Sequence, residues 1–214
     1  MIKDSALTRT KLLDAARDVI RAQGYAATTV DDICAAAGVS KGSFFHHFDS
    51  KEEMAVAAIG RFATMADTFF TTAPYAQHPD PRDRVLGYVD FRIAILEGEV
   101  AEFSCLMGTT VQETYQTHPA LRAACDEGMS QHIAMLERDL AAAKKIYAPD
   151  ALWSAEGVAY FMQAALQGAL IYAKVKQGPD IAASCLAHLR AYLVTLLGDP
   201  ESASEAETRG GTMP

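Results

Sequence analysis

The residues best suited to chemistry lie close together between positions 41 and 47. They are a lysine, a glycine and a serine in succession, Lys41, Gly42 and Ser43, followed by the adjacent histidines His46 and His47. A lysine amine donates hydrogen bonds to guanine O6 and N7, and a serine hydroxyl donates or accepts at a base edge. Glycine lets the backbone approach DNA, although it costs about 1 kcal/mol of helix propensity relative to alanine. This combination indicates contact with bases in the major groove.

The same segment offers groups that would hold the DNA backbone. We expect phosphate contacts from the amide and hydroxyl of Thr29, from His46 and His47, and from Lys51 at a helix N-terminus, where free amides attract anions. Phe45 is expected to offer only apolar contact to the backbone or to a thymine methyl group. The histidines would alternatively be a metal pair, although neighbours in a helix point about 100° apart.

Two short helices must position these groups. Thr29, followed by acids in the next turn, marks the start of one helix, and Gly38 ends it. Ser40 caps the next helix through its hydroxyl after a three-residue turn. Two short helices across a glycine turn form a helix-turn-helix pattern.

Longer helices flank this pair. A first helix of about fifteen residues or slightly more ends at Gly24. Ser50 and Glu53 predict a capping box that starts a fourth helix, over about residues 51–73, which connects to the rest of the chain.

Apolar residues recur at helical spacing through most of the remaining sequence. The predicted fold class is therefore all-α. We expect an N-terminal three-helix helix-turn-helix DNA-binding domain over residues 1–54 and a larger helical effector-binding and dimerisation domain over residues 75–198. Residues 199–214 are rich in Pro, Ser, Glu, Gly and Thr, so a disordered tail is expected there.

Composition limits the classes of function. The 214 residues are 50% apolar, which suffices for one or two domains, and the formal charge of −8 argues against wholesale adsorption to nucleic acid or anionic membrane. The first 54 residues carry seven basic and eight acidic side chains, so their basic groups must gather on one face to hold DNA. No apolar run is long enough for a bilayer span and no export signal starts the chain, so a cytoplasmic location is expected.

Cysteines and histidines provide no catalytic or metal pattern. The four cysteines include no CxxC pair and the six histidines no HExxH motif, so neither a disulfide framework nor a zinc module is indicated. We therefore predict no metal, no cofactor and no enzyme activity.

From Thr28 through Gly38-Val-Ser40 to Lys51 the chain resembles the TetR family of bacterial transcriptional regulators, a resemblance that covers roughly residues 9–54. It implies a homodimer on double-stranded operator DNA, with a small-molecule effector bound inside the larger domain. The family often has a tyrosine where Phe45 stands, so a phenolic phosphate contact is missing. One recognition helix contacts too few base pairs for a genome, which also favours a dimer on a palindromic site.

The effector pocket and the dimer contact are less clearly marked. Aromatic and methionine side chains with a few polar tips make adaptable apolar cavities, although the same residues also form plain core. The pocket candidates are Phe103, Cys105, Met107, Met129, His132, Trp153, Tyr160 and Phe161. Small residues in the last two helices suit a four-helix bundle between subunits, with Ala164, Ala165, Gly168, Tyr172, Cys185, Leu189 and Tyr192 at the dimer interface.

The leading interpretation is a dimeric repressor that a small apolar ligand releases from a palindromic operator. An alternative is a repressor switched by electrophile or oxidant modification of Cys105, whose thiolate a helix N-terminus would stabilise, as opposed to a buried inert thiol. A further alternative is a helical enzyme or carrier for apolar metabolites, but no paired base and nucleophile occur at a usable spacing. The acids Glu97, Glu99 and Glu102 form either a solvated helix end or a contact to a cationic effector.

Overall fold

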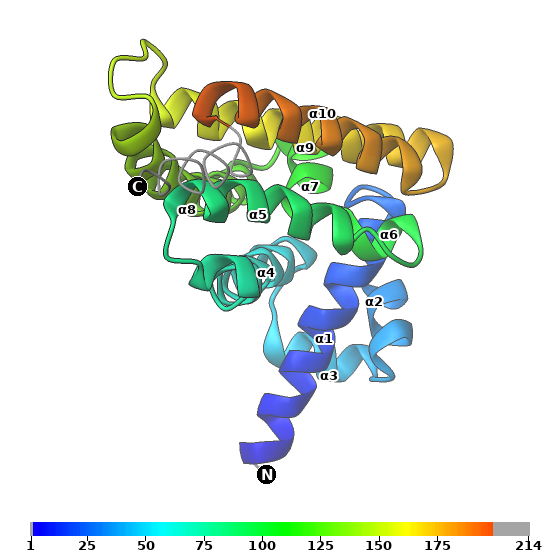
Figure 1. Ribbon diagram of the computed structural model, residues 1–214. Coiled ribbons are helices and arrows are strands. Elements are labelled where there is room, and N and C mark those ends of the chain that lie inside the picture. Colours follow the sequence, from blue (N-terminus) through cyan, green and yellow to red (C-terminus); the bar gives the residue numbers. More distant parts are fainter. Residues whose placement is uncertain (1, 199–214) are drawn as a thin grey trace, which may run out of the picture. The chain divides into compact units, whose positions relative to one another are not determined.

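The computed structural model describes residues 2–198, with side chains from Ser5 on (Figure 1). All of the regular secondary structure in this range is helical, which confirms the predicted all-α class. The predicted tail, residues 199–214, lies outside the described residues. By spatial contacts the chain divides into two compact units, and the helices α4 and α8 contribute to both.

Unit 1 comprises the described residues up to Phe69 together with Glu97–Gln131. Residues 97–131 therefore group with the first helices of the chain. The elements of this unit, some shared with unit 2, are α1 (Ile2–Gln23), α2 (Val30–Ala37), α3 (Lys41–His47), α4 (Lys51–Thr71), α6 (Val100–Phe103), α7 (Leu106–Thr114) and α8 (Pro119–Tyr147).

Unit 2 comprises Phe70–Leu96 and the described residues from His132 on. Besides the later part of α8, it contains the 3₁₀ helix η1 (Pro74–Gln77), α5 (Pro81–Ala94), α9 (Ala155–Lys176) and α10 (Asp180–Leu197).

Local capping contacts set the ends of α2 and α3. The Thr29 hydroxyl accepts a hydrogen bond from the Asp32 amide at 3.1 Å, and the Asp32 carboxylate accepts one from the Thr29 amide at 2.9 Å. Gly38, at a φ of 65°, ends α2 in the left-handed region that favours glycine. The Ser40 hydroxyl accepts from the Ser43 amide at 3.1 Å and starts α3. The predicted helix-turn-helix boundaries are confirmed.

The start of α4 differs in one detail from the predicted capping box. The Ser50 hydroxyl accepts from the Glu53 amide at 3.1 Å, as expected. The Glu53 carboxylate, however, accepts from the Asp49 amide at 2.6 Å rather than from the amide of Ser50. The donor of the reciprocal bond is therefore one residue earlier in the chain, at Asp49, which follows the C-cap residue of α3. The first helix, at 22 residues, is also longer than predicted.

Unit 1 has a continuous apolar core under its first four helices. The core also takes residues from α7 and from the beginning of α8, so residues distant in sequence share it. Its largest fully buried side chains include Leu12, Ile20, Ile33, Phe44, Met54, Ile59, Leu106 and Leu121.

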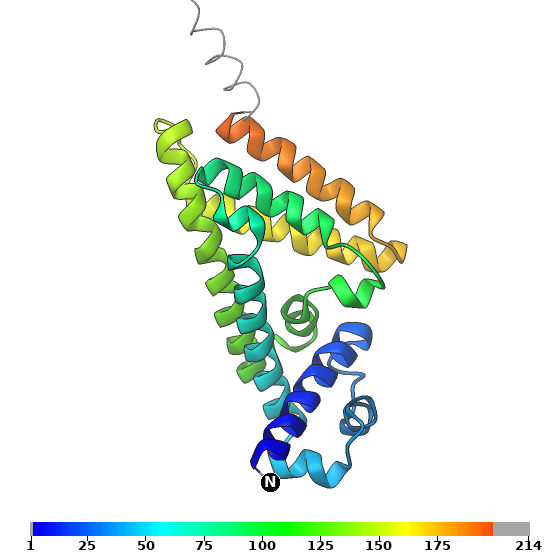
Figure 2. The same ribbon diagram turned by 60° about the horizontal axis from the view of Figure 1, so that its bottom comes forward.

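In unit 2, α10 packs against α9 and α5, and α9 and α10 run side by side (Figure 2). By length and composition α10 is apolar enough to cross a membrane, and 28% of it is buried within the described structure, where it contacts α9 and α5. Leu186 and Leu193 point into the core, while Arg190 pairs with Asp90 of α5 at 2.7 Å.

Candidate DNA-binding interface

The first turn of α3 is open to solvent, whereas its other side is anchored. Lys41 and Gly42 are exposed and Ser43 is half-buried. Phe44 is fully buried in the unit 1 core, while its neighbour Phe45 is 52% exposed. One phenylalanine therefore fixes the helix and the other projects from it, which leaves the predicted base-contacting residues on the surface.

Gly42 is not required by packing within the protein. A Cβ atom added there would meet only the Ser40 hydroxyl oxygen, at 3.7 Å, which is ordinary van der Waals contact. Glycine lowers the stability of a helix, so its presence is explained better by a molecule that approaches the backbone from outside. This favours the role predicted for Gly42 over the alternative that it is merely tolerated.

A polar groove of about 480 Å³ lies beside α3. Hydroxyl and imidazole groups, which hydrogen-bond to phosphate oxygens, dominate its wall. The residues of α1 in this groove were not predicted from the sequence, although two hydroxyls three residues apart on one helix could have indicated them. The groove is lined by Ser5, Thr8, Ser40, Gly42, Ser43, His46 and His47.

Lys41 forms an ion pair with Asp31 of α2, at 2.9 Å between Nζ and Oδ1. Both side chains are more than half exposed, so solvent screens the pair and it contributes little to stability. The amine of Lys41 is therefore only weakly committed to Asp31 and stays accessible from solvent. In the free protein, the carboxylate holds the amine beside the start of α3.

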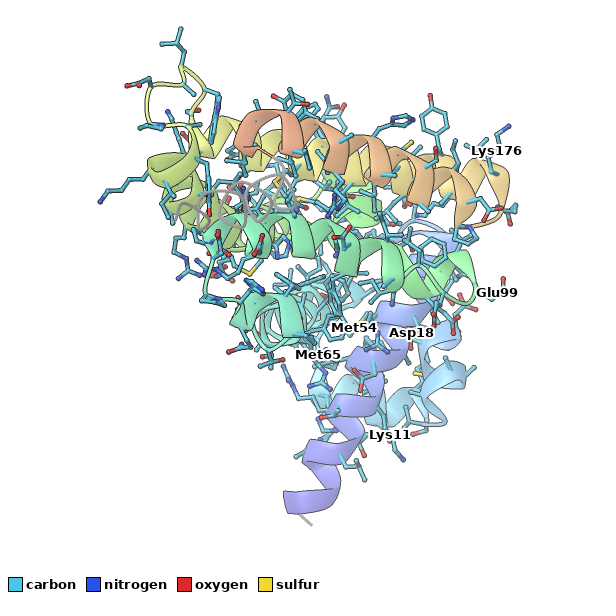
Figure 3. The ribbon with its side chains drawn as sticks, in the orientation of Figure 1. Lys11, Asp18, Met54, Met65, Glu99 and Lys176 are labelled. Carbon is cyan, nitrogen blue, oxygen red and sulfur yellow. The ribbon has the colours of Figure 1, made fainter. Side chains whose placement is uncertain are left out.

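The two histidines lie at the end of α3 with their rings in edge contact, 5.0 Å between centroids. Burial, and then the neighbouring charges of His46 and Arg9, lower the pKa of His47, so its ring is neutral at pH 7 and donates through one N–H. The Arg9 guanidinium lies over the Phe48 ring at 5.1 Å, and Lys11 is exposed further along α1 (Figure 3). His46 and His47 thus contribute ring nitrogens to the groove, and Arg9 and Lys11 add positive charge to the exposed surface of α1.

Two residues predicted to contact phosphate, Lys51 and Thr29, already make hydrogen bonds within unit 1. Lys51 donates to the carbonyl oxygens of Tyr25 at 3.0 Å and of Thr28 at 2.8 Å, and its amine lies 4.1 Å above the Tyr25 ring. Burial lowers the pKa of Lys51. The amide and hydroxyl of Thr29 both donate to Asp32, whose pKa these bonds lower. A phosphate at either residue would have to displace these contacts, and both roles stay predictions.

Comparison with known proteins supports the helix-turn-helix geometry. The family model of bacterial regulatory proteins of the tetR family matches residues 12–58, and that of the C-terminal domain of LmrA/YxaF-like transcriptional regulators matches residues 81–181. The chain belongs to the TetR family of transcriptional regulators.

Individual relatives agree with this membership. DhaR, an HTH-type transcriptional repressor of Mycobacterium sp. (strain GP1), is 28% identical over 179 residues, which cover 80% of this chain and 85% of DhaR. The HTH-type transcriptional repressor KstR2 of Rhodococcus jostii (strain RHA1) is 56% identical over 46 residues, 22% of each chain. The crystal structure of the reduced form of Escherichia coli NemR has a TM-score of 0.75 at 24% identity, over 90% of this chain and 98% of that one, a likeness in fold.

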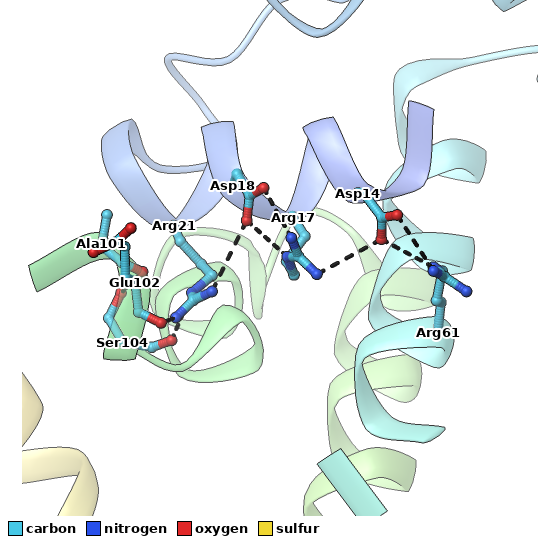
Figure 4. A network of polar contacts seen from close by, with 8 residues as sticks. All are labelled: Asp14, Arg17, Asp18, Arg21, Arg61, Ala101, Glu102 and Ser104. Atoms are coloured by element: carbon cyan, nitrogen blue, oxygen red, sulfur yellow. Dashed lines mark hydrogen bonds and ion pairs between the residues drawn. The ribbon is translucent and has the colours of Figure 1, made fainter. Parts of the chain in front are cut away.

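In this TetR-family chain, α1 is fastened to the segment that contains α6 and α7 (Figure 4). Arg21 donates to the carbonyl oxygen of Ser104 at 2.8 Å and to that of Glu102. The Glu113 carboxylate of α7 accepts from the amide of Ala26 at 2.7 Å, in the loop between α1 and α2. Two separate contacts thus hold the DNA-binding helices to residues 97–131.

The acidic cluster takes part in local structure. Glu102 accepts from the Glu99 amide at 2.8 Å in a capping box at the start of α6, whereas Glu97 is exposed. This arrangement is the solvated helix end, the first of the two interpretations.

The predicted effector-pocket residues are divided between the two units. Phe103, Cys105, Met107 and Met129 belong to unit 1, whereas the other four belong to unit 2. Within unit 2, Trp153 lies beside Lys144, whose amine is 5.1 Å from the ring centroid, and both Tyr160 and Phe161 are about half exposed. None of the described ring contacts of His132 involves Trp153, Tyr160 or Phe161.

The aromatic cluster around His132 was not predicted from the sequence. The Tyr88 hydroxyl lies 2.8 Å from His132 Nε2, and Gln163 donates to the same hydroxyl at 3.0 Å. Phe70 contacts the rings of both Tyr88 and His132, at 5.6 and 5.0 Å between centroids. Burial, followed by the charge of Arg92, lowers the pKa of His132 to about 3, so its ring is neutral. Three helices, α5, α8 and α9, meet through these polar groups.

The predicted dimer residues occupy α9 and α10 with different exposures. Tyr172 is 57% exposed, and Gly168 faces open space, since a Cβ atom added there would meet no atom of the described residues within 4 Å. Leu189, by contrast, is only 5% exposed and belongs to the core of unit 2. Phe161 packs on Tyr192 at 5.1 Å between centroids and adds apolar surface to this face. The remaining predicted residues are Ala164, which is exposed, and Ala165 and Cys185, which are half-buried.

Proposed function

We propose that this protein is a dimeric transcriptional repressor that places α3 of each subunit in the major groove of a palindromic operator. The observation that carries the proposal is the exposed first turn of α3, where Lys41 and Gly42 lie beside a groove of hydroxyl and imidazole groups. A recognition helix contacts base edges with its N-terminal residues, and the surrounding donors fix its register on phosphates. The protein acts in the cytoplasm as a regulator, without catalysis.

We infer that the second site of the switch lies in unit 2. A ligand shifts an equilibrium only if it binds one arrangement of the protein better than another. The helices α4 and α8 each contribute to both units, so a ligand that changes their arrangement reaches the DNA-binding helices through continuous chain. The contacts of Arg21 and Glu113 pass the change on to α1 and the α1–α2 loop.

The dimer uses the exposed face of α9 and α10 in this proposal. Tyr172 and Phe161 are large apolar side chains in solvent, and Gly168 permits close approach of another helix. A face of this kind suits a four-helix bundle formed by two helices from each subunit.

The experiment that tests the repressor proposal is footprinting on DNA from immediately upstream of the protein's own coding region, combined with a salt titration. We expect a protected palindrome that binds two chains, with affinity that falls as salt rises. If that region gives no protection at low salt, selection of bound fragments from the whole genome follows. Failure to enrich any palindrome in the selection would contradict the proposal.

A second candidate function, supported by the geometry of Cys105, is release through thiol modification. Cys105 is the N-cap of α7, where its sulfur accepts from the Gly108 amide at 3.4 Å. It is half-buried, so a small reagent can reach it, whereas Cys125 is fully buried and burial raises the pKa of Cys125 to about 12. Amides at a helix N-terminus stabilise a thiolate. One structural neighbour, NemR of Escherichia coli, was crystallised in a form described as reduced.

N-ethylmaleimide tests this candidate. The sulfur forms a bond to one alkene carbon of the maleimide and the thiol proton ends on the other, so nothing leaves and no oxidant is required. We expect the adduct on Cys105 by mass spectrometry together with loss of operator binding. A Cys105→Ser protein that loses operator binding in the same way as the wild type would eliminate the candidate.

A further inference from the structure

Unit 2 contains a cavity of about 160 Å³ beside the aromatic cluster. It is lined from η1, α5, α8 and α9, and its wall is mainly aromatic and aliphatic, with Tyr75, Val85, Tyr88, Met135 and Met162. Methionine and aromatic side chains adapt to the shape of an apolar ligand. An apolar cavity of roughly this size, about 150 Å³, accepts a benzene ring in other proteins.

One polar group in this wall has no partner among the described residues. The hydroxyl oxygen of Tyr75 is buried and makes no hydrogen bond to them. Its ring is held by Tyr88 and Phe91, at 5.9 and 5.5 Å between centroids. A buried hydroxyl without a partner is destabilising, so a ligand oxygen that accepted its proton would recover part of that cost.

The neighbouring polar groups satisfy one another. Gln163 donates to the Tyr88 hydroxyl at 3.0 Å, and that hydroxyl is also hydrogen-bonded to Nε2 of His132 at 2.8 Å. Tyr75 differs from them, because it lines the cavity and its hydroxyl has no hydrogen-bond partner among the described residues.

The charged side chains of the wall are either paired with each other or exposed to solvent. Arg84 pairs with Asp139 at 2.8 Å and donates to the carbonyl oxygen of His78 at 2.8 Å. Arg138 lines the cavity as well but is exposed, so solvent screens its charge. A charged ligand would lose its hydration in this cavity without a buried counter-charge.

We propose that this cavity binds a small uncharged aromatic molecule with a carbonyl oxygen that accepts a hydrogen bond from the Tyr75 hydroxyl. The proposal deepens the proposed function by naming the effector class, and rests on that function only for the effect on DNA. The ring lies among Met135, Met162 and Val85, and the oxygen replaces the missing partner of Tyr75. A site built to donate one hydrogen bond rejects an isostere that cannot accept it.

Three probes of nearly equal shape separate the contributions. Acetophenone has the ring and the carbonyl, α-methylstyrene replaces the oxygen by a CH₂ group, and benzoate adds a negative charge. Binding of each is measured by calorimetry on the full chain without DNA, for the wild type and for Tyr75→Phe. The Tyr75→Phe substitution removes only the unpartnered hydroxyl, so the fold is retained and a melting curve checks this.

We expect the wild type to bind acetophenone about five- to tenfold more tightly than α-methylstyrene, which matches the net contribution of one hydrogen bond. We expect Tyr75→Phe to bind both equally and the wild type to bind benzoate more weakly than acetophenone. Equal affinity for the first two probes in the wild type, a preference that survives in Tyr75→Phe, tighter binding of benzoate, or no binding of any probe would overturn the proposal.

Operator release is measured separately on the same samples. Acetophenone that binds through Tyr75 without affecting protein–DNA binding would support the ligand class and contradict the proposed regulation. Failure of the proposed ligand class can therefore be distinguished from failure of the proposed regulation of DNA binding.

Discussion

The guanidinium of Arg21 on α1 donates to the carbonyl oxygen of Ser104 at 2.8 Å, and Ser104 immediately precedes Cys105. The same guanidinium also donates to the carbonyl oxygen of Glu102 (Figure 4). A helix of the DNA-binding domain is thus bound directly to the segment that contains the candidate thiol. Modification of Cys105 would act at the end of this connection.

Arg21→Gln should lower the free energy of unfolding by about 2–3 kcal/mol, since two backbone carbonyl oxygens lose a charged donor. The Arg21 side chain is only 11% exposed, and burial lowers its pKa. Arg17→Gln is the matched control, because Arg17 is 23% exposed and pairs with the exposed Asp18, so its loss should cost less than about 1 kcal/mol. Urea denaturation measures both, and equal costs would show that the Arg21 contacts contribute nothing specific.

Gly42→Ala should separate folding from DNA binding. Because an added Cβ atom meets only an oxygen at 3.7 Å, the variant should be as stable as the wild type or up to about 1 kcal/mol more stable. Operator affinity should fall at least tenfold, since the methyl group would occupy the surface where DNA approaches. Thermal melting and a gel-shift titration provide the two readouts. Unchanged affinity would mean that DNA does not approach this turn closely.

His132 should make the protein less stable in acid. The folded pKa is lowered from 6.5 to about 3, so between these values the unfolded chain binds a proton that the folded chain does not. Stability therefore falls as pH decreases through this window, and His132 accounts for about 2 kcal/mol between pH 7 and pH 5. His132→Gln should remove this share of the pH dependence. Denaturation curves at both pH values test it, and an identical pH dependence in the variant would refute the assignment.

Gly168→Leu should produce monomers and weaken operator binding. The position faces open space within the described part of one chain, so the larger side chain has room in a monomer and meets resistance only from a partner subunit. Gly60→Leu is the control, since Gly60 is also a helical glycine with nothing within 4 Å. Light scattering reports the mass of each variant, and a dimeric Gly168→Leu protein would move the interface elsewhere.

The helix-turn-helix could be predicted from sequence because its boundaries depend on contacts three residues apart. Thr29 caps with Asp32 and Ser40 with Ser43. The engagement of Lys51 could not be predicted, because its partners, the carbonyl oxygens of Tyr25 and Thr28, lie 26 and 23 residues earlier. A lysine at a helix start has the same sequence pattern whether it faces DNA or its own domain.

The cavity could not be predicted from local sequence patterns either, because its residues are distant from one another along the chain. Tyr75 and Tyr88 come into contact only once η1 packs on α5, and the partners of Tyr88 come from two further helices. Aromatic and methionine content selected Phe103 and Met107, which lie in unit 1, as readily as His132, because composition does not indicate which helices meet.

The most direct test of the central claim is the affinity of Lys41→Ala for the footprinted operator and for a scrambled duplex. Lys145→Ala, which removes an exposed lysine of α8, is the control. Loss of a base contact costs about 1–3 kcal/mol, so Lys41→Ala should bind the operator about 5- to 150-fold more weakly while scarcely changing affinity for the scrambled DNA. Equal operator affinity for Lys41→Ala and Lys145→Ala would contradict recognition by the first turn of α3.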